Sequence, residues 1–167
     1  NDVLSDSSLF NLYVKAYSLL ESFRLGDMGA KDVFDLDRLS SFFAICEIIG
    51  SSHAMAHRNI RFYYNPITSK LEPVGYDAVY FREVNSLSIQ DFDISNDCSN
   101  RYHSDFMQLL WNDKGFISNY LNKLEVYSNS EYFKDFFSEI DKQLLEKTSI
   151  IHKEWPYYIF NPEHIIK

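Results

Sequence analysis

The chain has 167 residues, 46% of them hydrophobic and 17% aromatic, which excludes a disordered segment and predicts one globular domain, residues 1–167. Its net charge of −8 at pH 7 and its scattered Lys and Arg residues exclude nucleic acid and anionic lipid surfaces as expected partners. The sequence contains no long apolar run, so we expect no membrane insertion.

The first elements predicted along the chain are two helices. Apolar residues recur at helical spacing over residues 7–24, where Ser7 and Ser8 are predicted to cap the helix and Gly26 to end it. Residues 27–31 are predicted to be a linker. The second predicted helix spans residues 39–49 and has a wide apolar face.

The ends of the second helix also have sequence signals. Asp37 is the predicted N-cap, because a carboxylate there can accept hydrogen bonds from the first backbone N–H groups. Gly50 is a natural C′ residue, since glycine adopts a left-handed backbone at little cost.

A short β-hairpin is predicted next. Residues 60–65 and 71–76 are rich in β-branched and aromatic side chains, and Asn65-Pro66 opens the turn between them. Pairing the strands symmetrically about Thr68 sets Asn59 opposite Asp77. Facing residues of an antiparallel pair lie about 4.5–5.5 Å apart, so these two side chains are predicted to meet.

The remaining residues read as a polar loop followed by helices. Residues 82–100 are predicted to form a long loop whose acidic side chains are solvated, namely Asp91, Asp93 and Asp97. Helices are predicted over residues 104–111 and 115–127, and Ser128 to Glu131 fits a capping box for a last helix to about residue 147. The predicted fold class is therefore α+β, predominantly helical, around one antiparallel hairpin.

Asn59 and Asp77 form the first candidate site. An amide oxygen and a carboxylate are ligands that Mg²⁺ accepts, and Mg²⁺ sites often combine one or two protein carboxylates with substrate phosphates. The alternative is structural, because Asn and Asp are common turn formers beside strands.

Histidine and cysteine supply the other candidates. His53 and His57 are four residues apart, a spacing that puts both imidazoles on one helix face, but no further ligand for zinc is evident. The alternative is a polar loop in which both histidines bind backbone groups. We expect Cys46 to be a buried thiol, and a disulfide with Cys98 remains the alternative.

A run of motifs over residues 33–81 resembles a known family. In order it contains Asp35-Leu36-Asp37, the helix ending at Gly50, Arg58-Asn59, Phe62-Tyr63-Tyr64-Asn65-Pro66, Lys70-Leu71-Glu72-Pro73 and Tyr76-Asp77. This pattern is similar to the CotH family, the spore coat protein H-like proteins with an atypical protein-kinase-like fold. The resemblance covers under a third of the chain.

The resemblance implies a kinase-C-lobe-like helical bundle and a site for ATP and Mg²⁺. Asn59 and Asp77 would be the metal ligands, and Arg58 would contact phosphate. In a protein kinase the catalytic-loop Asp lies five positions before the metal-binding Asn, and that position here is Ala54. His53, the neighbouring residue, could replace the base because imidazole accepts a proton near neutral pH.

The chain also departs from a kinase in other ways. Ala78 follows Asp77 where a kinase has an aromatic residue, and no Gly-rich loop precedes Asn59. Residue 1 is Asn, so we expect this chain to be a C-lobe-like fragment of a larger protein.

Two functions are consistent with these observations. The first is a region of a CotH-like protein kinase that transfers phosphoryl groups from ATP to protein hydroxyls, with this chain alone inactive. The alternative is a non-catalytic pseudokinase or scaffold that docks proteins through its aromatic surface. The resemblance favours a location at the cell envelope or extracellular surface.

Overall fold

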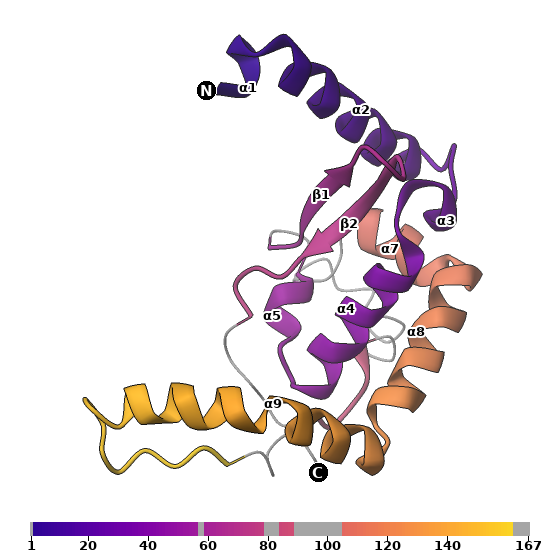
Figure 1. Ribbon diagram of the computed structural model, residues 1–167. Coiled ribbons are helices and arrows are strands. Elements are labelled where there is room, and N and C mark those ends of the chain that lie inside the picture. The colour runs from indigo at the N-terminus through magenta and orange to yellow at the C-terminus, as the bar shows by residue number, and fades with distance from the viewer. Residues whose placement is uncertain (1, 57–58, 79–83, 89–104, 162–167) are drawn as a thin grey trace.

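The computed structural model describes residues 2–56, 59–78, 84–88 and 105–161 of the chain (Figure 1). The elements, in chain order, are α1 (Asp2–Ser5), α2 (Ser7–Arg24), α3 (Ala30–Val33), α4 (Leu36–Ile48), α5 (Ser52–Met55), β1 (Arg61–Asn65), β2 (Lys70–Val74), α7 (Asp105–Asn112), α8 (Lys114–Tyr127) and α9 (Ser130–Ile151). The two strands form an antiparallel sheet, which confirms the predicted helical fold with one hairpin.

The body of the molecule contains the hairpin, α4, α5, α7 and α8, while α2 and α9 extend from its two ends (Figure 1). The most extensive packing between helices joins α4 to α8. Within the described residues, no helix is both long and apolar enough to cross a bilayer.

Aromatic side chains fill the core between α4, α7 and α8. Phe43 of α4 meets Trp111 of α7 edge-on with ring centroids 5.6 Å apart, and it meets Phe116 of α8 at 5.3 Å. Tyr120 is fully buried beside them, with its ring 5.3 Å from Trp111. Edge-to-face packing of this kind stabilises a core beyond its area burial, so this cluster holds α4, α7 and α8 together.

The helices begin one or two residues away from several predicted positions. Asp6 rather than Ser7 caps α2, Asp35 rather than Asp37 caps α4, and Asn129 rather than Ser128 caps α9. In each case an Asp or Asn oxygen accepts one or two backbone N–H groups of the first turn. Each of these segments offers several capping residues, so the sequence indicated the helix and not its first residue.

Two more boundaries differ from the prediction. The expected linker over residues 27–31 ends early, because α3 begins at Ala30. The last helix continues to Ile151, four residues beyond the predicted end. Gly26 and Gly50 have φ of 76° and 65°, which confirms that both take the left-handed conformation that ends a helix.

The hairpin register corrects the predicted pairing by one residue. Asn65 pairs with Lys70 and Arg61 with Val74, so four residues form the turn and no single residue lies on its axis. Extending this register places Asn59 opposite Tyr76, not opposite Asp77. The turn is stabilised by Asn65, whose Oδ1 accepts the N–H of Ile67 at 2.9 Å.

Several sequence predictions fall outside the described residues. They concern His57, Arg58, Cys98 and the acidic residues of the long polar loop, Asp91, Asp93 and Asp97.

Candidate functional site

The candidate site lies where α5 approaches the segment that follows β2. His53 of α5 and Asp77 are 24 residues apart in sequence, and Nε2 of His53 lies 2.9 Å from Oδ2 of Asp77. An ionised carboxylate can only accept a hydrogen bond, so a neutral His53 paired with it carries its proton on Nε2. Both side chains are about one-third exposed, at 32% and 37%, so a small ligand can reach them.

Asn59 contacts the backbone of the same histidine. Its Nδ2 donates to the backbone carbonyl of His53 at 3.0 Å, and its own N–H donates to the carbonyl of Ala56 at 2.7 Å. The first of these bonds uses an N–H of the side-chain amide, whose Oδ1 is an acceptor. Both predicted metal ligands therefore contact His53, Asp77 at its ring and Asn59 at its backbone.

Asp77 has a left-handed backbone, with φ of 54°. This conformation costs an L-residue roughly 1–2 kcal/mol, although Asp and Asn tolerate it better than most residues. An exposed His–Asp pair contributes only about 0–1 kcal/mol to stability, so the pair alone does not offset such a cost with any margin. An Asp that keeps a strained backbone at the end of a hairpin is more typical of a binding site than of a stabilising contact.

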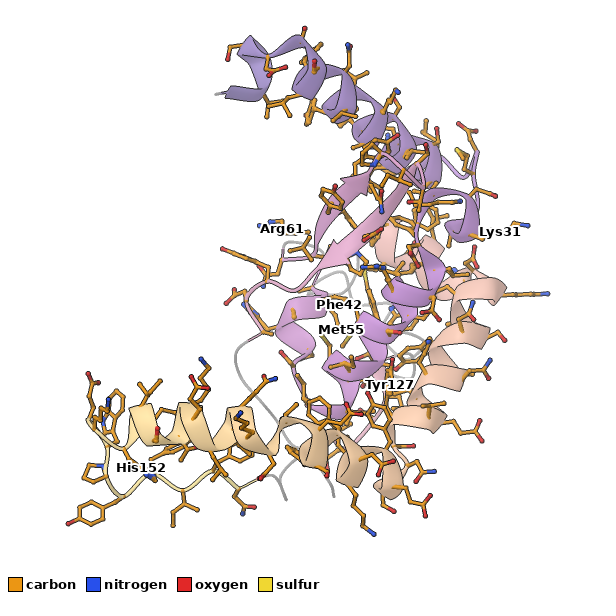
Figure 2. The ribbon with its side chains drawn as sticks, viewed as in Figure 1. Lys31, Phe42, Met55, Arg61, Tyr127 and His152 are labelled. Carbon is orange, nitrogen blue, oxygen red and sulfur yellow. The ribbon has the colours of Figure 1, made fainter. Side chains whose placement is uncertain are left out.

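A cationic side chain stands beside the same end of the hairpin. The guanidinium carbon of Arg61 lies 5.0 Å from the ring centroid of Tyr76, the residue before Asp77. Nη1 of Arg61 also donates to the carbonyl of Ile60 at 3.0 Å. Figure 2 shows Arg61 at the edge of the hairpin, where it can add positive charge near a bound phosphate.

A metal ion here would need ligands from outside the protein. Across the described part of the chain, no three His, Cys, Asp or Glu side chains gather into a metal site. Asn59 and Asp77 each carry side-chain oxygen, the donor type of Mg²⁺, which commonly takes one or two protein oxygens and completes its shell with phosphate and water. Oδ2 of Asp77 faces His53, and a carboxylate has a second oxygen for an ion.

The residue at the position of the kinase base has no side chain that can accept a proton. Ala54 is fully buried in α5, whereas the adjacent His53 faces Asp77. The base role predicted for His53 depends on its reach to a substrate hydroxyl and stays a prediction.

The sequence did not reveal two contacts of this site. The direct contact of His53 with Asp77 has no local signal, because it joins a helix to a residue 24 positions later, beyond both strands of the hairpin. The stacking of Arg61 on Tyr76 could have been found from the correct register, which brings both residues to one end of the hairpin.

Comparisons of the chain with protein-family models, with curated proteins and with solved structures found no match.

Proposed function

We propose that this chain carries the divalent-cation and ATP site of a CotH-like, kinase-fold protein, with Asn59 and Asp77 as its protein ligands. The observation that supports the proposal is that both residues flank the open end of the hairpin and both contact His53, Asp77 through its ring and Asn59 through its backbone carbonyl. A protein kinase likewise holds Mg²⁺ with the catalytic-loop Asn and a later Asp. The chain order here is also a helix, a loop with an Asn, a hairpin and an Asp.

The charges near the site suit a bound nucleotide. ATP brings negative phosphate oxygens, which the cation shields from an acidic protein. Arg58, which directly precedes Asn59, would pair with phosphate, and Arg61 adds a second positive charge nearby. The larger protein would transfer the terminal phosphoryl group to a protein hydroxyl.

This chain alone should transfer phosphate slowly. Phosphoryl transfer depends on a phosphate-covering loop, a Lys and metal ligands that act together. The sequence has no Gly-rich loop before Asn59, and the position five residues before it is the buried Ala54. The proposal for the chain itself is therefore binding, with turnover assigned to the larger protein.

The test measures binding and transfer on the same samples. Calorimetry with Mg²⁺ and ATP should show binding to the purified chain, and Asp77→Ala should abolish it because a ligand oxygen is lost. Asp135→Ala is the matched control, since Asp135 is an exposed carboxylate on α9, away from the site. Binding that Asp77→Ala leaves unchanged would contradict the site.

The same proteins can be incubated with radiolabelled ATP and a Ser-rich acceptor. We expect little or no labelled acceptor from any of them. Robust transfer that disappears in Asp77→Ala would contradict the expected inactivity, while it would support the kinase assignment.

A non-catalytic scaffold is the second candidate function. It is favoured by the aromatic tail after α9, in which Trp155, Tyr157 and Ile159 are 64%, 94% and 83% exposed. Exposed apolar side chains gathered on one segment are typical of docking surfaces. A folded chain that binds neither Mg²⁺ nor ATP would favour this function over the first.

A further inference from the structure

The spacing of the His53–Asp77 pair is that of a hydrogen bond, and it is also compatible with two neighbouring ligands on one metal ion. Neighbouring ligands of an octahedral ion with bonds of about 2.1 Å lie about 3.0 Å apart. Nε2 of His53 and Oδ2 of Asp77 are 2.9 Å apart. A small rotation of the ring and the carboxylate turns Nε2 and Oδ2 toward a common point. The proton on Nε2 moves to Nδ1 through solvent, and the lone pair that this frees on Nε2 then binds the ion.

We propose that His53 binds the divalent cation through Nε2 beside Asp77, and that the site therefore prefers Mn²⁺ to Mg²⁺. This inference rests on the proposed function, because it names a further ligand of the same site. Mg²⁺ favours oxygen ligands, whereas imidazole nitrogen suits first-row transition metals. Mn²⁺ accepts both kinds of ligand in octahedral geometry, and it also binds phosphate oxygens.

The surroundings of His53 support a ligand role. The Asn59 side chain donates to the backbone carbonyl of His53 at 3.0 Å, so a residue of the same site fixes the backbone from which the ring extends. The imidazole is 32% exposed, which leaves room for an ion with its phosphate and water ligands. Asp77 reaches the ring from a left-handed backbone, so the hairpin end directs the carboxylate at His53 in a conformation that an Asp adopts only at a cost.

The test is electron paramagnetic resonance of Mn²⁺ added to the full chain, with and without ATP. Electron spin echo modulation detects a nitrogen nucleus bound to Mn²⁺, so the unaltered protein should show a ¹⁴N coupling. In His53→Gln that coupling should disappear and Mn²⁺ affinity should fall by about tenfold or more, since loss even of a residue that only orients a ligand costs about that much. Mg²⁺ affinity should change much less.

His152→Gln is the matched control. His152 is exposed at the end of α9 and contacts the carbonyl of Tyr158, so its replacement should leave the Mn²⁺ spectrum and affinity unchanged. The unfolding midpoint of each variant shows whether it is folded. The ¹⁴N coupling is measured first in the unaltered protein. That measurement tests the inference even if a replacement perturbs folding.

The possible results separate this inference from the proposed function. Mn²⁺ that is bound through Asp77 but shows no nitrogen coupling overturns the ligand role and leaves the cation–ATP site standing, and so does a coupling that persists in His53→Gln. If His53→Gln is folded and binds Mn²⁺ as tightly as the unaltered protein, the inference is wrong. A folded chain that binds neither cation overturns both proposals.

Discussion

At position 77 a left-handed backbone and a hydrogen-bonded carboxylate occur in the same residue. The carboxylate contacts His53, while the backbone conformation is one that a side chain with a Cβ disfavours. The two properties can be separated by substitution, because glycine keeps the backbone and removes the carboxylate. Stability and binding should therefore respond differently to changes at this position.

We expect Asp77→Ala to be less stable than Asp77→Gly by about 1 kcal/mol, because alanine retains the left-handed strain and glycine relieves it. The measurement is urea unfolding of both variants, with both expected to lose ATP binding. Ala78→Gly is the control, since residue 78 has no left-handed backbone and glycine there should not stabilise the fold. An alanine variant as stable as the glycine variant would contradict the strain at this position.

The Cys46 thiol shows a second effect at the residue scale. Burial, followed by the negative charge of Glu47, raises the pKa of Cys46 to about 12 from the ordinary value of 9.0. Because the folded state keeps the proton, its stability is fully present below about pH 9 and falls as the pH rises toward 12. Tyr120 acts in the same direction, since burial and then Glu47 raise its pKa as well.

We therefore expect the free energy of unfolding to decrease between about pH 9 and pH 11 and to decrease less steeply in Cys46→Ala. Chemical denaturation at several pH values measures both slopes. In a Cys98→Ser background, which leaves Cys46 as the sole thiol, a thiol reagent at pH 8 should react only after denaturant is added. Rapid labelling of the folded protein would contradict the buried, protonated thiol.

The sequence indicated which residues lie at the site, but it did not indicate which of their atoms are in contact. Asn59 precedes and Asp77 follows the open end of a hairpin that its turn signals reveal, and His53 contacts both residues. Which atoms meet depends on the register of the hairpin, and a four-residue turn shifted that register by one residue. A shift of this size changes which side chains face each other, so the pairing needed the structure.

At the scale of elements, Asp113 joins two helices by its one side chain. Its Oδ1 accepts the N–H of Phe116 at 2.9 Å and so caps α8, while its Oδ2 accepts the N–H of Ala30 at 2.9 Å at the start of α3. The second bond is part-buried and joins residues 83 apart in sequence. The carboxylate thus satisfies two helix N-termini, which both favour negative charge.

We expect Asp113→Ala to lower the free energy of unfolding by about 2–3 kcal/mol, since it removes a helix cap and leaves a second N–H unpaired. Asn129→Ala is the comparison, because Asn129 caps only α9 through the N–H of Glu131 and is exposed. Its loss should cost about 1 kcal/mol. Equal effects in thermal or urea unfolding would contradict the double role of Asp113.

Helices were predictable as elements because their apolar periodicity extends over many residues. Their first residues and the short α3 were not, because neighbouring Asp and Ser residues compete as caps and a four-residue helix has no period to detect. The start of α3 depends instead on the hydrogen bond from the Ala30 N–H to Asp113, a residue in the other half of the chain.

At the scale of the whole molecule, the buried side chains are distributed unevenly. Six residues of α4 are buried, whereas none of the 22 residues of α9 is. α9 packs on α8 and on the chain's own tail, where Phe160 meets Phe137 with centroids 6.2 Å apart. α2 is intermediate, since its one buried residue, Phe23, lies near the end that meets the body.

This distribution predicts the order in which backbone amides open. Amides exchange with solvent through local unfolding, whose free energy is small where few side chains are buried. Hydrogen–deuterium exchange with mass spectrometry should show peptides of α4 and α8 exchanging slowest, and peptides of α9 at least about ten times faster, a gap of about 1.4 kcal/mol. Within α2, exchange should be slower around Phe23 than around Phe10, which is 41% exposed, and this gradient along one helix serves as an internal control. Protection of α9 equal to that of α8 would mean that another surface covers α9 in solution, and the exchange should then depend on protein concentration if that surface belongs to a second copy of the chain.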